Sequence, residues 1–553
     1  MHLSRIIPDF AFGMCLAGAR KKNLSPNISM SNHPIDTIQS SAHTVESKRD
    51  FWTRLDELCN PRRLAILAFL IGVVVMLLYK PFDRPEIGDP TIYDYVAQSI
   101  LRGQLPYRDV IDIKTPGAQY LSALTIAVGS VFDVRDIFAI RALHVVLVGL
   151  LSVLIFLVTN VYLQSRVAAA IAVLIPLLRE PIAKTFIGGT QPKLPMIIFG
   201  LLTLIMIAKD RPLAAGVFSM LSCLCWQPGL LFTGTAMLIF SRYFTSWRDL
   251  KALKVLAGAI IPLSLVLGYF YSKGALADLW AWTITYNYSV FGPEAGPTLG
   301  EAIKHIVMIV RRVFERDVLL VLLSIVGLLL FLVRRAGQRV KNGSALGSTE
   351  LFRDAIVLPP LIYGVFMLIN FQGPPDLIPI VPFVGIFASW ALVWFASVLG
   401  QKAPVAGQTR LHASELVGAV VFAVILAVVF WRAGTFKLRG LKLRDQDAAV
   451  AQLRQDLQSD RIYVHGAVEL LVLLNTPNLN PYVDFDWGKD NFAASMRGVS
   501  FQYLLDEMEV QAPKYVALTR LRKVYHRKEL KRWVEERYQP VELWRKRSLY
   551  VRR

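Results

Sequence analysis

The sequence predicts an α-helical polytopic membrane bundle of about ten to thirteen spans, followed by a small C-terminal α/β domain. Three observations support this fold class. Hydrophobic residues make up 54% of the 553 residues, and the mean hydropathy is +0.44, which is more than a water-soluble domain usually carries. The apolar residues come in blocks of membrane-spanning length. After the last block, short apolar strands alternate with amphipathic helical patterns.

The first fifty or so residues are largely polar, with many Ser and Asn, and lack the order of regions that defines a signal peptide. We therefore expect a disordered N-terminus over residues 1–62, with Met30 as an alternative start. Arg62 and Arg63 stand directly before the first apolar block, and the positive-inside rule places them in the cytoplasm. The loop after the first block is then expected on the outer face.

The transmembrane domain is expected over residues 63–432, because its apolar runs approach the roughly 17–25 residues that a helix needs to cross a bilayer. One long run is interrupted at Trp226, Gln227 and Pro228, where a proline removes a backbone donor and predicts a break. The candidate spans are 64–79, 116–132, 138–162, 167–178, 194–208, 213–241, 252–272, 318–333, 354–370, 377–399 and 414–431.

The net charge of +20 does not indicate a nucleic-acid partner. The basic residues gather at the ends of apolar runs, as at Lys209, Arg242 and Arg334, which is the distribution expected for membrane topology and for attraction to anionic lipids. The four cysteines give neither a disulfide framework nor a metal-ligand spacing. The histidines form no metal-ligand pair at helical spacing, so we expect no metal and no cofactor.

The loop over residues 80–116 carries the densest set of ionisable side chains next to the bundle. Asp89 and Pro90 have the order expected at a helix start, and Gly103 suits its end. The apolar residues between them have the spacing of one helix face, which predicts a short amphipathic helix on the membrane surface. Asp89 therefore has two compatible interpretations, a structural N-cap and a fixed catalytic carboxylate.

Further along this loop, Tyr107, Arg108, Asp109, Asp112 and Lys114 precede the next apolar run. A lysine at the mouth of a bundle can neutralise a lipid phosphate, and a nearby aspartate can accept a proton from an attacking hydroxyl. Solvated loop charges are the alternative.

The order Asp89-x-x-x-Tyr93, a short helix, a glycine with an aromatic residue, and then Lys114-Thr115-Pro116 resembles the first outer loop of the GT-C glycosyltransferases. The resemblance is to the polyprenyl-phosphate-sugar-dependent group related to the protein O-mannosyltransferases and the lipid A aminoarabinose transferase. It implies an integral membrane hexosyl or pentosyl transferase that moves a sugar from a polyprenyl-phosphate donor to a lipid, glycan or protein acceptor. The site would face outward, and a bacterial inner membrane is the expected location.

In this resemblance Asp89 takes the role of the base that activates the acceptor, while Lys114 and Arg108 meet the charge of the donor phosphate. The chain departs from the family pattern at Pro90, where many members have a second acid, so Glu86 or Asp94 would have to assist. It also departs after Lys114, which is followed by a threonine and a single proline. Further possible helpers are Tyr93, Asp112 and Asp376.

Residues 433–553 are expected to form the small α/β domain. The predicted strands are Arg461–His465, Tyr515–Leu518 and Leu549–Arg552, and the predicted helices lie near Asp445–Ser459, Phe501–Val510 and His526–Arg537. The basic residues between Arg432 and Arg444 favour a cytoplasmic position for this domain. The GT-C layout favours the extracytoplasmic side, which we expect because long domains are translocated largely regardless of charge.

Weaker candidates lie elsewhere. Asp484-Phe485-Asp486 matches a metal-binding pattern of nucleotide-sugar transferases, but such a short pattern is more often a loop between strands. Polar residues at breaks between spans are more often helix-end residues than ligands; these are Gln191, Lys193, Asn287, Glu294 and Asn370. The rival function is a multi-pass transporter or flippase of a lipid-linked or anionic solute, which would bury ionisable residues in mid-span.

Overall fold

The structure is a computed structural model that describes residues 60–553. It leaves out residues 179, 242–249, 292–297, 314–317, 343–351, 372, 402–409, 458–461, 542–543 and 545–547. The expected disordered segment 1–62 therefore lies outside the described residues except for its last three positions, and Glu294 also lies outside them.

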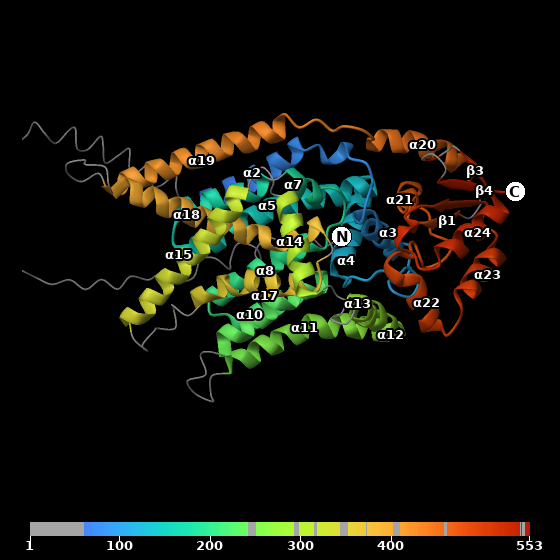
Figure 1. The fold of residues 1–553 in the computed structure, drawn as a ribbon, viewed down its shortest axis with the longest axis horizontal. Helices are drawn as coiled ribbons and strands as arrows, with labels where there is room; N and C mark the ends of the chain where they lie inside the picture. The colour runs from blue at the N-terminus through green and yellow to red at the C-terminus, as the bar shows by residue number, and fades with distance from the viewer. Residues whose placement is uncertain are drawn as a thin grey trace, which may run out of the picture. The chain divides into compact units, whose positions relative to one another are not determined.

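Helices form the bundle (Figure 1). In chain order they are α2 (Pro61–Leu78), α4 (Gly117–Val131), α5 (Asp136–Leu163), α6 (Arg166–Leu177), α7 (Glu180–Phe186), α8 (Lys193–Ala208), α9 (Pro212–Cys225), α10 (Leu230–Ser241), α11 (Lys251–Ser272), α12 (Leu276–Trp280), α13 (Tyr286–Phe291), α14 (Leu299–Val313), α15 (Val318–Asn342), α17 (Leu358–Ile369), α18 (Val381–Gln401) and α19 (Arg410–Gly434). Short turns connect some of them, namely η2 (Pro81–Asp83), η3 (Gln227–Gly229), the π-helical η4 (Ala281–Thr285), η5 (Phe352–Ile356) and η6 (Pro374–Ile380).

Within the described residues, seven helices are long and apolar enough to cross a membrane, and four shorter apolar helices accompany them. This establishes a polytopic helical bundle, while the total of about ten to thirteen spans stays a prediction. The break predicted inside 213–241 is confirmed. Helix α9 ends at Cys225, Trp226 is extended, and α10 begins at Leu230 after the turn η3.

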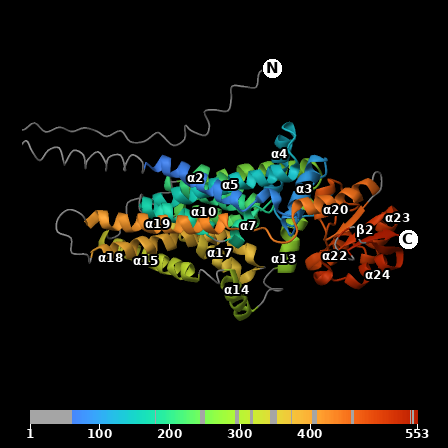
Figure 2. The same ribbon diagram turned by 90° about the horizontal axis from the view of Figure 1, so that it is seen from above.

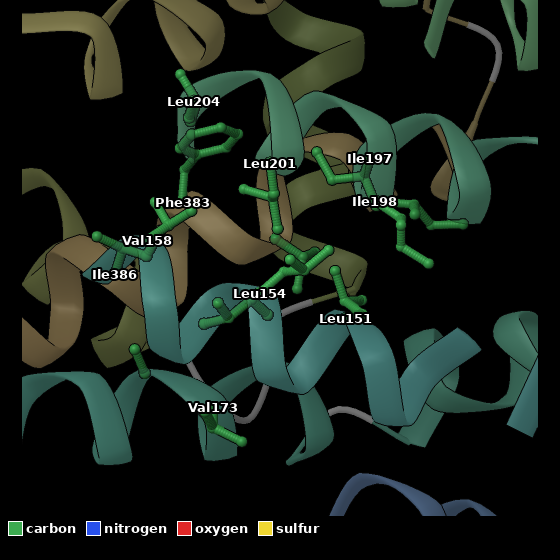
Figure 3. Close-up of a cluster of buried hydrophobic side chains, with 14 of the residues drawn as sticks. Leu151, Leu154, Val158, Val173, Ile197, Ile198, Leu201, Leu204, Phe383 and Ile386 are labelled. Carbon is green, nitrogen blue, oxygen red and sulfur yellow. The ribbon is translucent and has the colours of Figure 1, made fainter. Parts of the chain in front are cut away.

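The core of the bundle lies where α5 meets α6, α8 and α18. Figure 3 shows side chains from these four helices interdigitating, among them Leu154, Leu201 and Phe383. Helix α5 is apolar around its whole circumference, as expected for a helix surrounded by others. Lipid tails are as apolar as these side chains, so the stabilisation comes from close packing. Small residues allow it: a Cβ at Gly149 of α5 would lie 2.8 Å from the Phe69 ring of α2.

The C-terminal domain contains a four-stranded sheet with strand order β1-β2-β4-β3, drawn in red in Figure 1. Strand β1 (Ile462–His465) pairs in parallel with β2 (Tyr515–Leu518), and β4 (Leu549–Arg552) pairs antiparallel with both β2 and β3 (Tyr538–Val541). The sequence predicts three of these strands. It misses β3, which contains Pro540, and the sheet accommodates that proline by placing β3 at its edge.

The helices of this domain partly follow the prediction. They are α20 (Leu443–Asp456), α21 (Glu469–Leu474), α22 (Lys489–Arg497), α23 (Phe501–Gln511) and α24 (Arg527–Arg537), with the turns η7 (Asp486–Gly488) and η8 (Leu521–Lys523). The three predicted helices correspond to α20, α23 and α24. Helices α21 and α22 are too short to show a helical period in the sequence.

The C-terminal domain contacts the loop that follows the first span. Helix α3 (Pro90–Leu101) packs its buried Tyr95 and Val96 into one apolar cluster with Leu471 of α21. The Asn478 N–H donates to the Tyr95 hydroxyl over 2.7 Å. The apolar face of α3 therefore meets protein, while its position on the membrane surface stays a prediction. Both views show α3 beside the C-terminal domain (Figures 1 and 2), so loop and domain share one side of the bundle.

Candidate functional site

Asp89 stands at the start of α3 with its carboxylate accessible. The side chain is at the N-cap position but makes no capping hydrogen bond. The backbone carbonyl of Gly88 instead accepts from the Thr91 N–H over 3.3 Å, and also from the Thr91 hydroxyl over 2.7 Å; Gly88 has a φ of +81° that favours glycine. The Asp89 side chain is 72% exposed, and its Oδ1 lies 3.7 Å from Nη1 of Arg520. The expected side-chain cap is absent, so a capping role does not explain this carboxylate.

Lys114 is positioned by its own loop. Its backbone N–H donates to Oδ1 of Asp112 over 3.1 Å, and its carbonyl accepts from the Tyr107 hydroxyl over 2.7 Å. Tyr107 is buried and has a φ of +73°, a conformation that costs energy for a residue with a side chain. The surrounding structure therefore holds this turn in place. The Asp112 carboxylate also accepts a hydrogen bond from the Gln119 side chain. Burial raises the pKa of Asp112 above its ordinary value, and the hydrogen bonds and the charge of Lys114 offset only part of that rise.

The break between α9 and α10 supports the same loop from the other side. The Gln227 side chain donates to the carbonyl of Ile113 over 2.8 Å, and the Asn287 side chain donates to that carbonyl over 2.9 Å. The Thr115 hydroxyl donates to the carbonyl of Cys223 over 2.8 Å. Gln227 and Asn287 therefore act as positioning residues for the segment that presents Lys114.

A cavity of about 670 Å³ opens beside Lys114. Two charged residues that act on each other, Lys114 and Asp376, line it, and we call this part the polar end. Gln227, Thr283, Asn287 and Asn370 are the other polar lining residues, and the rest of the wall is mainly apolar. The apolar lining comes from the α9–α10 break, from the π-helical turn and from α17; it includes Trp226, Pro228, Leu230, Leu231, Ile284, Ile362, Phe366 and Ile369. A long apolar chain with one charged head fits this combination of surfaces.

A second lysine stands at the polar end. Lys193, the first residue of α8, has its Nζ 3.0 Å from Oδ1 of Asp376 and 4.5 Å from the centroid of the Trp226 ring. The Nζ of Lys114 lies 5.6 Å from the same ring. Burial and the charge of Lys193 lower the pKa of Lys114 to about 8. The two ammonium groups thus share a partly desolvated region that attracts an anion.

Tyr93, in helix α3, lies within electrostatic reach of both Asp89 and Asp376. Burial raises the pKa of Tyr93 well above its ordinary value. Nearby carboxylates raise it further, in the order Asp112, Asp89, Asp376 and Asp484. The Tyr93 hydroxyl therefore stays protonated and can donate a hydrogen bond. Asp89 does not line the cavity, although its charge acts on Lys114.

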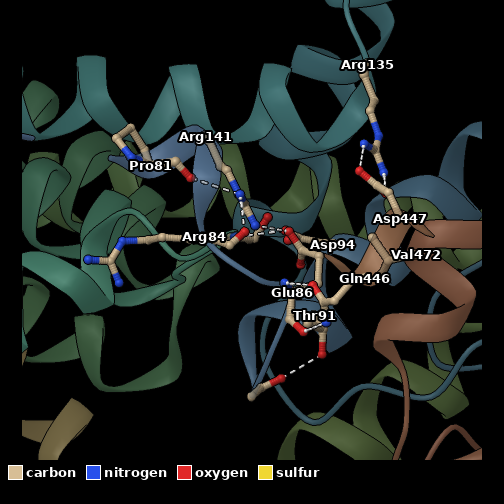
Figure 4. Close-up of polar contacts among 12 residues, drawn as sticks. Pro81, Arg84, Glu86, Thr91, Asp94, Arg135, Arg141, Gln446, Asp447 and Val472 are labelled. Carbon is tan, nitrogen blue, oxygen red and sulfur yellow. Dashed lines mark hydrogen bonds and ion pairs between the residues drawn. The ribbon is translucent and has the colours of Figure 1, made fainter. Parts of the chain in front are cut away.

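Glu86 and Asp94 belong to a closed network (Figure 4), and neither residue lines the cavity. Glu86 is ion-paired with Arg141, and both side chains are 0% exposed. Its backbone N–H donates to the Gln446 side chain over 2.7 Å. Burial raises the pKa of Asp94 well above its usual range, and the charge of Glu86 raises it further. Asp94 accepts from the N–H of Thr190 over 2.8 Å, so it positions the segment that leads to Lys193.

Arg108 lies elsewhere. Its guanidinium is half exposed, pairs with Asp109 at 3.0 Å and donates to the carbonyl of Lys273 over 3.1 Å. It lines a second cavity, of about 550 Å³, together with Trp282 and Arg497. The structure therefore does not bring Arg108 to Lys114, and Lys193 is the second cation there.

Charged and aromatic side chains of the C-terminal domain lie near Asp89. Lys523 places its Nζ 2.9 Å from the centroid of the Trp487 ring, and the negative charge of Asp89 also acts on Lys523. Asp484 is bonded to Lys489; burial raises the pKa of Asp484, but that lysine takes it below its ordinary value. In the part of the chain that the structure describes, no group of three His, Cys, Asp or Glu could hold a metal ion. The Asp484-Phe485-Asp486 pattern thus binds a lysine through its first acid.

Sequence reasoning named Lys193 only as a helix-end residue and did not identify Arg520, Trp487 or Lys523. The one available signal for Lys193 was a lysine after a polar break at the start of an apolar helix. No local signal marks the residues of the C-terminal domain, because their position depends on its contact with the first loop.

No protein-family profile and no curated protein sequence matches the chain. Solved structures do match. ArnT from Cupriavidus metallidurans bound to undecaprenyl phosphate is 10% identical, over 88% of this chain and 97% of that chain, with a TM-score of 0.54. The oligosaccharyltransferase AglB from Archaeoglobus fulgidus, in complex with an inhibitory peptide and a dolichol-phosphate, is 12% identical, over 83% of this chain and 69% of that chain, with a TM-score of 0.50. The chain therefore shares its fold with ArnT and AglB, in line with the resemblance of its first loop.

Proposed function

We propose that the chain is an integral membrane glycosyltransferase that moves a hexose or pentose from a polyprenyl-phosphate donor to a hydroxyl of a lipid, glycan or protein acceptor. The cavity of about 670 Å³ carries the proposal, because its mainly apolar wall also contains Lys114 and Asp376, and Asp376 is paired with Lys193. A polyprenyl phosphate has the matching chemistry of a long apolar chain and an anionic head. The same fold binds undecaprenyl phosphate in ArnT.

The reaction we propose is a direct displacement. Asp89 accepts the proton of the acceptor hydroxyl as its oxygen forms a bond to the anomeric carbon. The bond from that carbon to the phosphate oxygen breaks, and its electron pair leaves with the lipid phosphate. Lys114 and Lys193 stabilise the negative charge that develops on the lipid phosphate. The protonated Tyr93 hydroxyl can donate a further hydrogen bond to an oxygen of the substrates. Such a displacement inverts the anomeric centre and uses no cofactor.

The proposed partners are the polyprenyl-phosphate sugar, the acceptor and membrane lipids, without nucleic acid. The proposed location is a bacterial inner membrane, with the first loop and the C-terminal domain on the outer face. The cytoplasmic preference of the basic residues at Arg62 and Arg63 supports this orientation. A reporter fused after Asp89 should be active only outside the cytoplasm. Activity inside would contradict the orientation.

The decisive experiment compares native membranes with Asp89→Asn membranes, using labelled polyprenyl-phosphate sugars. Turnover should fall by at least about a hundredfold if Asp89 is the base. The Asp89 side chain makes no capping hydrogen bond, so the substitution leaves the start of α3 intact. Full activity of the variant would end the catalytic role of Asp89. Movement of labelled lipid between leaflets without sugar transfer would support the flippase alternative.

A further inference from the structure

The polar end of the cavity carries an acid that a phosphate would have to meet. Asp376 lines the cavity together with Lys114 and holds the Nζ of Lys193 at 3.0 Å. Its side chain is only 9% exposed, and that of Lys193 is 12% exposed. Asp112 and Asp89 also act on Lys114, but Asp376 is the carboxylate that lines the cavity and pairs with Lys193. A phosphate that enters must therefore share Lys193 with Asp376.

The Asp376 carboxylate is fixed in place. Its Oδ2 accepts from the N–H of Gly373 over 3.3 Å, and its backbone carbonyl accepts from the Tyr363 hydroxyl over 2.7 Å. It lies in the turn η6, whose first two residues are the rigid Pro374 and Pro375. The acid therefore stays close to any anion held by the two lysines.

The substrate and the product of the proposed reaction differ in charge. A sugar linked to a polyprenyl phosphate is a phosphodiester with one negative charge. The departing lipid phosphate is a monoester with close to two charges at neutral pH. Coulomb energy is proportional to charge, so a fixed carboxylate repels the monoester about twice as strongly as the diester at equal distance.

We propose that Asp376 is a specificity-determining residue of the phosphate pocket: it favours the singly charged phosphodiester donor and weakens retention of the doubly charged lipid phosphate. Lys193 alternates between Asp376 in the empty pocket and the phosphate in the occupied pocket. The same repulsion disfavours a pyrophosphate-linked donor, which carries a second charge. This inference rests on the proposed function of the cavity.

The test measures binding to the purified full-length protein in detergent at a pH of about 7.5, where the monoester carries close to two charges. The probes are undecaprenyl phosphate, a monoester, and its methyl ester, a diester. Asp376→Asn keeps an oxygen for the Gly373 N–H and removes the charge. We expect the variant to bind both probes more tightly and the ratio of monoester to diester affinity to rise on the order of tenfold. An unchanged ratio, or weaker binding of the monoester, overturns the proposal.

Matched variants separate the explanations. Asp376→Ala is a second neutral variant and must change the ratio in the same direction, whereas Asp376→Glu keeps the charge and should stay near the native ratio. Asp210→Asn removes a different Lys–Asp pair, with Lys251 at 2.8 Å, and should leave the ratio unchanged. If the native protein binds neither probe, the proposed function fails. If it binds both and all variants have the native ratio, only the role of Asp376 fails.

Discussion

Glu86 with Arg141 and Lys193 with Asp376 are two buried ion pairs near the same mouth of the bundle, yet their surroundings differ. The first pair is 0% exposed on both sides, and its arginine also donates to the carbonyls of Pro81 and Arg84. The second pair lies at the end of a cavity of about 670 Å³. Protein atoms surround the first pair, while the second faces space that a ligand can occupy.

The two clusters also differ in their charged groups. In the closed cluster, burial raises the pKa of Asp94 well above its usual range, and the one buried guanidinium, that of Arg141, is paired with Glu86. In the open cluster, Lys193 is paired with Asp376, and a second ammonium group, that of Lys114, lies nearby. A closed, paired cluster serves the fold, whereas an open cluster with two lysines beside a cavity is arranged for an anion.

The largest expected effect breaks the closed pair. Glu86→Gln leaves Arg141 buried without its counter-charge, and such losses typically cost about 3–5 kcal/mol of stability. Thermal unfolding in detergent measures it. The matched control Asp210→Asn disrupts a pair whose aspartate is 61% exposed, and should cost at most about 1 kcal/mol. If Glu86→Gln unfolded like the native protein, the first pair would not be structural.

The next effect belongs to the open cluster and should leave the fold intact. Lys114→Gln removes the charge and keeps much of the stem, so thermal unfolding should barely change. Loss of phosphate stabilisation is commonly worth a few kcal/mol, so turnover should drop by about a hundredfold or more. An unstable variant, or a stable and fully active one, would show that Lys114 only anchors the lip of the next span.

A pH series sharpens the contrast further. Lys114 has a pKa of about 8, and only its protonated form attracts phosphate. We expect kcat/KM for the donor to fall about tenfold for each pH unit above 8. The folded-state pKa lies below the ordinary value of 10.5, so the folded state binds this proton less tightly and stability should rise with pH between 8 and 10.5. Lys114→Arg should remove the fall in kcat/KM. A parallel loss of activity and stability would point to unfolding instead.

The smallest effect concerns the exposed pair of Asp89 and Arg520. Their charged atoms are 3.7 Å apart, and the side chains are 72% and 35% exposed. Pairs of this kind contribute at most about 1 kcal/mol, so Arg520→Gln should change unfolding very little. Turnover should change less than tenfold, as measured with the same labelled donor. A loss as large as that of Asp89→Asn would make Arg520 part of the chemistry.

The features of the fold that depend on local pattern could be predicted. Apolar blocks predicted the bundle, Pro228 marked the break between α9 and α10, and alternating patterns predicted β2 and β4. Strand β3 was missed because Pro540 is tolerated only at a sheet edge, and edge position is set by the other strands. The burial of α3 was missed because its partner α21 is distant in the sequence.

The candidate site shows the same division. Lys114 and Asp376 could be named because each stands at the end of a predicted span. Their proximity to Lys193 depends on how segments distant in the sequence pack together. Arg108 follows the same loop pattern as Lys114, and only the three-dimensional path of the loop separates their cavities. Asp89 was correctly placed at the start of α3. The Thr91 N–H, however, donates to the backbone carbonyl of Gly88, which no sequence pattern reveals.

The contact between Glu86 and Gln446 sets an order for biogenesis. The two residues are 360 positions apart, and each donates a hydrogen bond to the other. At a synthesis rate of about 5–20 residues per second, the first loop waits on the order of half a minute before its partner exists. During that interval the first loop lacks the domain that packs against helix α3. The nascent chain therefore passes through a stage in which its spans can already be inserted while the site is still unassembled.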